Sequence, residues 1–364
     1  MYSLYFTLFC IIHLWIISAL LLVNKRNRSS NGLLAAFFLL FSVIHLQHLA
    51  LQTGFLDEYP YIDPVSGILL CAAFPVFYFY VLSLTGSFRW KNHRNIKHLI
   101  MVVPAILNLL YLMLFKSKEE ISAYYYEEEN RFTVTNALLL GGMVLLLLLY
   151  VLKSLQAIKS YSKRLEENFS STEQIRLDWL NHLILFLLFL ALFLGPLLIV
   201  IGLPEWNRIG MGIYTSSIYL SLMLKTLNQP LVHMEEVQRK SGFKLDEEKK
   251  TGYQIRLLKC MEELKPYLNP ELSLKQLSEL TGISVNDLSG LINEKYNYSF
   301  FDFVNSFRVK EFKQLISDPQ KTHLKLEALG EESGFGSKTA FNRSFKKLTG
   351  KTPTEFRNSH HPVN

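Results

Sequence analysis

Residues 334–353 read "GFGSKTAFNRSFKKLTGKTP", a stretch in which basic and aromatic residues alternate at helical spacing. Phe341, Phe345 and Leu348 recur at the interval that places side chains on one face of a helix. Lys, Arg, Thr and Asn occupy the positions between them. Residues 337–351 hold five basic residues and no acidic one. The pattern predicts a short helix with an apolar inner face and a basic outer face.

The same pattern occurs a second time, earlier in the chain. Leu274, Leu277, Gly282, Ser284 and Leu288 correspond to Leu326, Leu329, Gly334, Ser337 and Phe341, with one more residue in the second turn. Each copy predicts a helix, a tight turn and a second helix. Gly282 and Gly334 suit a turn position with positive φ, and Ser278 and Gly330 are small enough for two helices to cross closely. This arrangement is the helix-turn-helix plan, present twice.

Serine and threonine residues mark where these helices begin. Ser273 with Gln276, Ser284 with Asp287 and Thr352 with Glu355 have the spacing of capping boxes. Ser337 is expected to cap the helix of the opening stretch, and Gly350 to end it. On a second helix of this kind, a basic outer face favours contact with DNA over a merely solvated surface.

Two segments, "KPYLNPELSLKQLSELTGISVNDLSGLIN" and "ALGEESGFGSKTAFNRSFKKLTGKTPTEFR", resemble the AraC/XylS-type DNA-binding domain. The resemblance covers about residues 253–358 and includes a long joining helix at about 298–317. It implies that the second helix of each copy enters the major groove of double-stranded promoter DNA. The whole chain resembles the membrane-bound members of that family in layout.

The resemblance also assigns roles to residues. Those implied to face the bases are Asn286, Ser289, Gly290, Lys338, Thr339 and Asn342, and those implied to hold phosphates are Ser337, Arg343, Lys346 and Lys347. There are two departures from the family pattern. Gly290 has no side chain where a long polar residue is often found, so the first copy is expected to read few bases. Phe312 replaces a usual alanine, which we interpret as a difference in packing.

The rest of the chain is strongly apolar. Of the 364 residues 49% are hydrophobic and 19% charged, and residues 183–201 run without a charge, close to the roughly 20 residues that span a bilayer. Seven apolar segments are predicted, at about 3–23, 32–53, 64–84, 98–115, 133–152, 179–202 and 209–228. Because basic residues follow the first segment and none precedes it, we expect a membrane helix there and not a cleaved signal peptide.

Loop charges predict the orientation of these segments. The first, third and fifth loops carry twelve basic residues, whereas the second, fourth and sixth carry four. The positive-inside rule then places the N-terminus outside and the C-terminal part in the cytoplasm. In a bacterium this is the compartment that holds the DNA, so the predicted location is the inner membrane.

Some polar residues fall inside the apolar part. His45, His48 and Gln52 share one face of the second segment. They are candidates for a ligand site, or they fix helix packing through hydrogen bonds. The outer loop at 123–132, "AYYYEEENRF", could cap a cationic ligand or form an interface belt. No catalytic motif, metal-binding spacing or cofactor signature is present, so we expect neither an enzyme nor a metal or cofactor.

We therefore predict an all-α chain with a seven-helix transmembrane domain at 1–228, a polar linker at 229–252, the DNA-binding domain at 253–358 and a tail at 359–364. The predicted function is a membrane-embedded transcription regulator that senses a signal through its helices. A passive membrane-anchored DNA tether and a transporter or channel with a regulatory DNA-binding part remain as alternatives. Promoter DNA, the lipid bilayer, RNA polymerase, a signal ligand and a second copy of the chain are the expected partners.

Overall fold

The computed structural model describes residues 2–88, 93–121, 134–189, 192–193, 205–230, 246–321 and 323–360. Within these ranges the chain is helical and contains no named strand, as predicted. The chain divides into two compact units. Unit 1 comprises Met1–Lys159 and Asp178–Leu231, and unit 2 comprises Ser160–Leu177 and Val232–Asn364. Residues 160–177, which the sequence analysis assigned to the transmembrane domain, thus make their contacts in unit 2.

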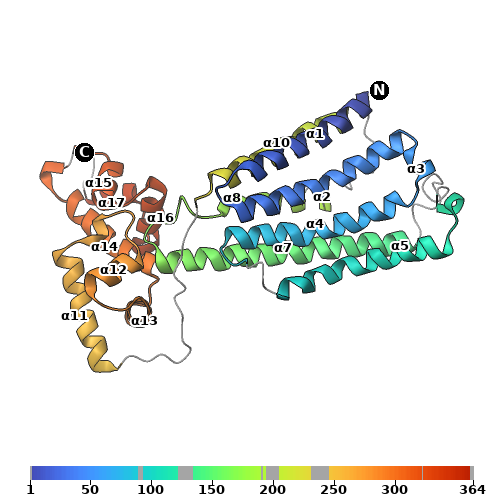
Figure 1. Ribbon diagram of the computed structural model, residues 1–364. Coiled ribbons are helices and arrows are strands. Elements are labelled where there is room, and N and C mark those ends of the chain that lie inside the picture. The colour runs from blue at the N-terminus through green and yellow to red at the C-terminus, as the bar shows by residue number, and fades with distance from the viewer. Residues whose placement is uncertain are drawn as a thin grey trace. The chain divides into compact units, whose positions relative to one another are not determined.

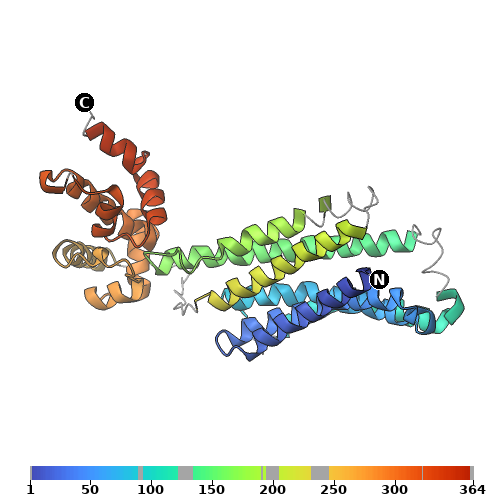
Figure 2. The ribbon, with the colours of Figure 1, turned by 90° about the horizontal axis from the view of Figure 1, so that it is seen from above.

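Long helices make up most of unit 1. Its elements are α1 (Tyr2–Val23), α2 (Arg28–Gln52), α3 (Phe55–Glu58), α4 (Ile62–Leu84), η1 (His93–Val102), α5 (Val103–Phe115), the first part of α7 (Val134–Asn168), α8 (Asp178–Phe189) and α10 (Glu205–Asn228). Helix α2 packs against both α1 and α4, and α1 also packs against α10. Figures 1 and 2 show α1, α2 and α4 side by side. These contacts bury one stripe of each helix and leave another apolar stripe exposed.

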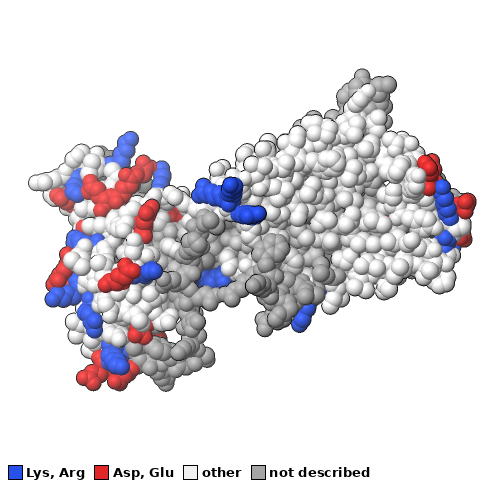
Figure 3. All heavy atoms as spheres, viewed as in Figure 1, with Lys and Arg blue, Asp and Glu red and all other residues white. Residues whose placement is uncertain are grey.

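Among the described residues, four helices are long and apolar enough to cross a membrane. They are Leu4–Val23, Arg28–Gln52, Ile62–Leu84 and Gly141–Asn168. Helices α5 and α8 are also apolar but span 13 and 12 residues. On the face seen in Figure 3, the charged atoms of unit 1 gather at its two ends and leave the middle uncharged. The count of seven membrane helices stays a prediction.

Polar contacts in unit 1 hold Gln229, the residue directly after α10. Asn27 has a left-handed backbone with φ 56°, and its side-chain amide donates to the carbonyl of Gln229 at 2.9 Å. The indole of Trp179 donates to the side-chain oxygen of Gln229 at 3.2 Å. Gln229 is therefore fixed by two partners at the point where the chain leaves α10.

Short helices make up unit 2. Besides the last part of α7, from Ser160 to Asn168, they are α11 (Glu247–Glu263), η4 (Pro266–Leu268), α12 (Leu274–Thr281), α13 (Val285–Tyr296), α14 (Phe300–Ile316), η5 (Pro319–Lys321), α15 (Leu326–Glu332), α16 (Lys338–Thr349) and α17 (Pro353–His360). Helix α14 occupies the place of the expected joining helix. Helix α11 begins inside the predicted linker and continues through Gly252. Residues 231–245 of that linker lie outside the described residues.

Helix α14 contributes to two apolar cores. Phe303 and Val304 belong to the first core, with residues of α11, α12 and α13. Phe312 belongs to the second, with residues of α15 and α16. Its ring is fully buried, and its centroid lies 4.7 Å from that of Phe341 and 5.2 Å from that of Phe345. The extra volume of Phe312 relative to alanine therefore fills the space between α14 and α16.

The ends of the short helices follow the local sequence. The hydroxyl of Ser273 accepts the backbone N–H of Gln276, and the Gln276 side chain accepts the N–H of Ser273, which completes the predicted capping box. Thr352 and Glu355 form the same reciprocal pair at the start of α17. Gly282 ends α12 with φ 63°, a value that an L side chain adopts only with strain.

Candidate nucleic-acid interface

Helix α16 presents one apolar and one polar face. The hydroxyl of Ser337 accepts the backbone N–H of Ala340 at 3.1 Å and so caps the helix. Phe341 and Phe345 are buried in the second core. The exposed residues of this helix include Lys338, Thr339, Asn342, Arg343, Lys346 and Lys347. Because the inner face is fixed by packing, these six side chains are held on the outside of unit 2.

Two glycines allow α15 and α16 to lie close together. A Cβ atom on Gly330 would stand 3.0 Å from the ring of Phe341. Gly334 has φ 93°, and a Cβ atom there would come within 2.3 Å of the carbonyl oxygen of Tyr267. Only glycine satisfies both the backbone angle and the space at position 334. The turn between α15 and α16 thus packs closely against Tyr267 and Leu268 of η4.

Three of the basic side chains on α16 have acidic neighbours. Lys338 pairs with Glu327 of α15, and Lys347 Nζ lies 2.7 Å from a carboxylate oxygen of Asp302 on α14. Arg343 Nη2 lies 3.7 Å from Glu173 Oε1, and its guanidinium stands 5.0 Å from the ring centroid of Phe301. The Lys338–Glu327 pair is exposed on both sides and contributes little stability, whereas the side chains of Asp302 and Glu173 are only 15% and 20% exposed.

The second helix of the first pair, α13, offers fewer polar side chains. Asn286 is exposed. Ser289 is only 5% exposed, and the side-chain amide of Asn293 donates to its carbonyl at 2.8 Å. Nothing stands within 4 Å of a Cβ atom placed on Gly290. Of the three residues expected to face bases in this copy, Asn286 alone presents a side chain at the surface.

The most buried charge in unit 2 is Arg308 of α14, which the sequence analysis did not single out. Its side chain is 1% exposed. Nε donates to the carbonyl of Tyr267 at 2.7 Å, and Nη2 donates to the carbonyl of Asn269 at 2.8 Å. Nη1 donates to the side chain of Asn305 at 3.2 Å and to the carbonyl of Ser170 at 3.0 Å. Nη2 also donates to the hydroxyl of Ser170 at 2.9 Å.

All five N–H groups of this guanidinium therefore have an acceptor. Burial lowers the pKa of Arg308 to about 10, against which the charge of Glu173 acts in the opposite direction. Arg308 is still a cation at neutral pH. A buried cation is tolerated when every donor is satisfied, so the loop carbonyls and Ser170 together make this position stable. A sequence pattern could not have found it, because its acceptors come from three separate segments.

Residues 277–359 match the model of a family described as a helix-turn-helix domain. These residues form an AraC-type helix-turn-helix domain. An uncharacterized HTH-type transcriptional regulator of Staphylococcus aureus strain COL is 31% identical over 91 residues. Counterparts in strains MSSA476 and N315 are similar to the same extent. The matched region is 25% of this chain and 12% of each relative. No solved structure matches the chain significantly.

The AraC-type domain contains both helix pairs that carry the expected DNA contacts, with α12 beginning three residues before the matched region. Six of the ten residues expected to touch DNA lie exposed on α16, and Ser337 caps that helix. The other three lie on α13. The fold thus brings most of the expected contacts to one helix face of the domain.

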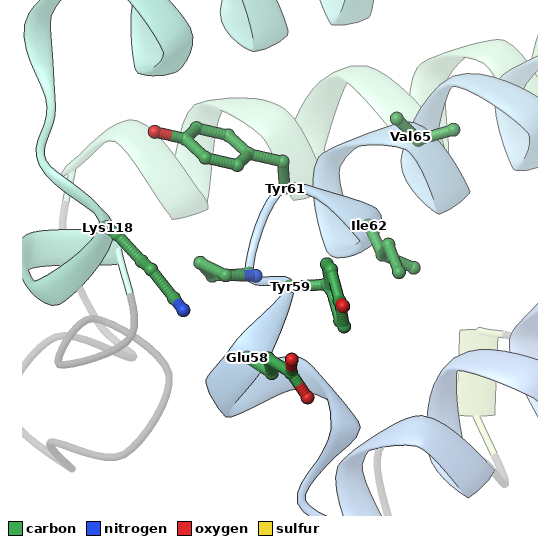
Figure 4. Close-up of a pocket in the computed structure, with 7 residues that line it drawn as sticks. Glu58, Tyr59, Tyr61, Ile62, Val65 and Lys118 are labelled. Atoms are coloured by element: carbon green, nitrogen blue, oxygen red, sulfur yellow. The ribbon is translucent and has the colours of Figure 1, made fainter.

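Two open cavities lie in unit 1, near the short helix α3. One, of about 410 Å³, is lined by Glu58, Tyr59, Pro60, Tyr61, Ile62, Val65 and Lys118. Figure 4 shows the Lys118 ammonium and the Tyr61 ring on one side of it, with Ile62 and Val65 on the other. The second, of about 490 Å³, lies between α2 and α4 and shares Ile62 and Val65 with the first. Their walls are mainly apolar.

The predicted ligand face of α2 does not border these cavities. Leu46, Gln47 and Ala50 line the second cavity, whereas His45 and His48 do not. His48 Nε2 lies 2.9 Å from Gln52 Nε2. This contact is exposed and lies within α2 itself, so it tests neither the packing interpretation nor the ligand one. The outer loop at 123–132 lies outside the described residues. Among the described residues, no group of three or more His, Cys, Asp or Glu side chains could hold a metal ion.

Proposed function

We propose that this chain is a membrane-embedded, sequence-specific DNA-binding transcription regulator. The observation that carries the proposal is the exposed basic face of α16 within an AraC-type helix-turn-helix domain. Helices of this kind read base edges in the major groove. The relatives named HTH-type transcriptional regulators support the same function.

The roles of individual residues follow from their places on α16. Lys338, Thr339 and Asn342 lie in the first half of the helix and face the bases in this proposal. Arg343, Lys346 and Lys347 neutralise phosphates, since each is exposed and cationic. In the first pair, Asn286 is the side chain that reaches the groove, so most base reading falls to the second pair.

Membrane embedding is supported by unit 1. It has four helices of sufficient length and hydropathy, and many of their large apolar side chains are exposed, among them Phe9 at 50%, Ile12 at 54% and Leu20 at 52%. Exposed apolar surface of this extent is costly in water. A bilayer removes that cost, and DNA binding then requires that unit 2 face the cytoplasm.

Signal sensing is the second part of the proposal. The cavities beside α3 suit a small, mainly apolar ligand carrying a group that interacts with Lys118 or Glu58. A passive tether and a transporter with a regulatory domain remain the competing functions. A response of transcription to an added ligand distinguishes a regulator from a tether, and solute flux in vesicles would support a transporter.

Binding of duplex DNA by the full chain, reconstituted in lipid nanodiscs, tests the central claim. The chain should retain a duplex, and the observed affinity should fall steeply between 50 and 200 mM salt, because phosphate contacts release counterions. Lys346→Ala should reduce the slope by about one ion. Absence of duplex binding by the folded full chain at low salt would exclude the proposed function.

A further inference from the structure

Residues 169–173 of unit 2 form a segment, here named the docking segment, that is seated on the AraC-type domain. Phe169 makes an isolated antiparallel bridge with Ser273. The backbone N–H of Ser170 donates to the carbonyl of Leu272 at 3.1 Å. These contacts attach the docking segment to the start of α12, in the first helix pair.

Ser170 also completes the acceptor set of Arg308. The guanidinium donates to the carbonyl of Ser170 at 3.0 Å and to its hydroxyl at 2.9 Å. Ser170 is 1% exposed. Without the docking segment, two of the five N–H groups of a buried cation would lose their protein acceptors and turn to water. The docking segment therefore completes the hydrogen bonding of the buried Arg308 guanidinium in the domain.

The same segment reaches the second helix pair. Ser171 lies against Gly336, where an added Cβ atom would stand 3.4 Å from the Ser171 hydroxyl and 4.0 Å from its Cβ. Glu173 lies 3.7 Å from Arg343 of α16, and its side chain is 20% exposed. Arg343 is one of the cations to which the proposed function assigns a phosphate. Glu173 thus occupies the position of an anion on the DNA-binding face.

The docking segment is joined by the chain to α7 on one side and to α8 on the other. Residues 160–168 of α7 and residues 174–177 belong to unit 2 together with the docking segment, and the chain belongs to unit 1 before Ser160 and after Leu177. The chain therefore passes between the units three times, at the two ends of residues 160–177 and between Leu231 and Val232. Residues 160–177 are thus a covalent connection from α7 and α8 to the AraC-type domain.

We propose that the docking segment and the DNA backbone compete for Arg343, so that a docked segment weakens DNA binding and its release strengthens it. The partner of the Arg343 surface is a segment of the same chain, in which Glu173 is the one acidic residue. The inference rests on the proposed function, because it needs DNA as the competitor. The competition is electrostatic, because the Glu173 carboxylate and a DNA phosphate are both anions that pair with the Arg343 cation.

A disulfide tests the docking itself. The Cβ–Cβ distance of 4.0 Å at positions 171 and 336 lies within the range of disulfides, and Gly336 has no positive φ. The full chain carrying Ser171→Cys and Gly336→Cys should cross-link under oxidised glutathione, whereas either single variant should not. The three natural cysteines are buried. Failure of the double variant to cross-link in the folded full chain would overturn the proposal.

The oxidised double variant, in which the disulfide holds the docking segment on the domain, then tests the competition. A random-sequence DNA duplex is the probe. We expect the oxidised double variant to bind the duplex about three- to ten-fold more weakly than the same protein after reduction. Adding Glu173→Gln should restore most of that loss. Glu166→Gln is the matched control, because Glu166 pairs with Arg176 within residues 160–177 and should change nothing.

The outcomes separate the two claims. Equal affinity of the oxidised and reduced double variant, or a loss that Glu173→Gln does not relieve, would overturn the competition and leave the proposed function standing. A folded chain that binds no duplex in any state would exclude the proposed function and the competition with it. Cross-linking, weakened binding and relief by Glu173→Gln together support the proposal.

Discussion

Asn342 and Lys346 lie one turn apart on the exposed face of α16, yet they are expected to make different contacts with DNA. An asparagine side chain can make two hydrogen bonds to a base edge, whereas a lysine meets a phosphate as a point charge. The burial of Phe341 and Phe345 fixes the rotation of the helix. Which residues face outward therefore follows from the packing, and the division into base and phosphate contacts stays a prediction.

Asn342→Ala should cost roughly 1–3 kcal/mol on the preferred promoter and relax the preference at one base pair. Lys346→Ala should weaken specific and random duplexes about equally, since every duplex has the same phosphates. Competition binding against a set of single-base variants of the promoter measures both effects. If the two variants lose affinity to the same extent on specific and random DNA, the assignment of faces on α16 is incorrect.

At the scale of elements, the turn before α16 holds the two halves of the domain together. A Cβ atom at Gly334 meets the Tyr267 carbonyl at 2.3 Å, and the Tyr267 hydroxyl donates to Glu311 of α14 at 2.8 Å. Burial, and then this hydrogen bond, raise the pKa of Tyr267, so the phenol stays protonated at neutral pH and keeps donating. The turn, η4 and α14 therefore form one connected structure.

Gly334→Ala is expected to destabilise unit 2 by at least about 2 kcal/mol, because the methyl group adds both backbone strain and overlap. Gly252→Ala in α11 is the matched control. Nothing stands within 4 Å of its added Cβ atom, and alanine is the better helix former by about 0.5–1 kcal/mol. Hydrogen exchange of the unit 2 amides in the full chain measures both. Comparable protection in the two variants would contradict this account of the turn.

The candidate ligand residues of α2, His45, His48 and Gln52, are not the residues of this helix that line the second cavity. If the ligand binds at His45 and His48 instead of in the cavities beside α3, replacing both by leucine should abolish the signal response while membrane insertion and DNA binding persist. Reporter transcription, membrane fractionation and duplex binding measure the three properties. His182→Leu on α8 is the control. Loss of folded protein from the membrane would instead support a packing role for the two histidines.

At the scale of the whole molecule, the charge distribution predicts one orientation. Glu119, in the helical turn at 118–121 after α5, is exposed, and so is Lys259 on α11, at 67% of its side chain. Glu119→Cys should react with a membrane-impermeant thiol reagent in intact cells. Lys259→Cys should react only after permeabilisation, because the positive-inside rule places unit 2 in the cytoplasm. The reverse labelling would overturn the orientation and the proposed DNA function together.

Replacing unit 1 with an unrelated membrane anchor tests whether its helices regulate transcription or only attach the chain to the membrane. A ligand shifts the DNA-binding unit only if it binds one arrangement of the helices better than another. We expect a chimera with an unrelated three-helix anchor, carrying residues 160–177 as its cytoplasmic loop, to bind DNA while transcription stays at one level. Retaining residues 160–177 keeps Ser170 available to Arg308. A chimera that still follows the native inducing condition would exclude sensing by unit 1.

Local sequence by itself determined the two helix pairs of unit 2, the joining helix α14 and the caps at Ser273, Ser337 and Thr352, whereas α11 was not expected inside the linker. Serine caps, positive-φ glycines and apolar residues at helical intervals act over a few residues, so Ser273, Gly334 and Phe341 could be assigned their places without a structure. Apolar run length likewise predicted long membrane-competent helices, four of which occur among the described residues.

Only the tertiary structure decided which distant segments meet. Arg308 is stable in the interior because its acceptors come from Tyr267, Asn269, Asn305 and Ser170, and no periodicity records such a gathering. The structure also placed residues 160–177 with the DNA-binding part, although their sequence lies between two apolar segments. Hydrogen bonds and ion pairs depend on atoms within a few ångströms in space, and separation along the chain does not limit them.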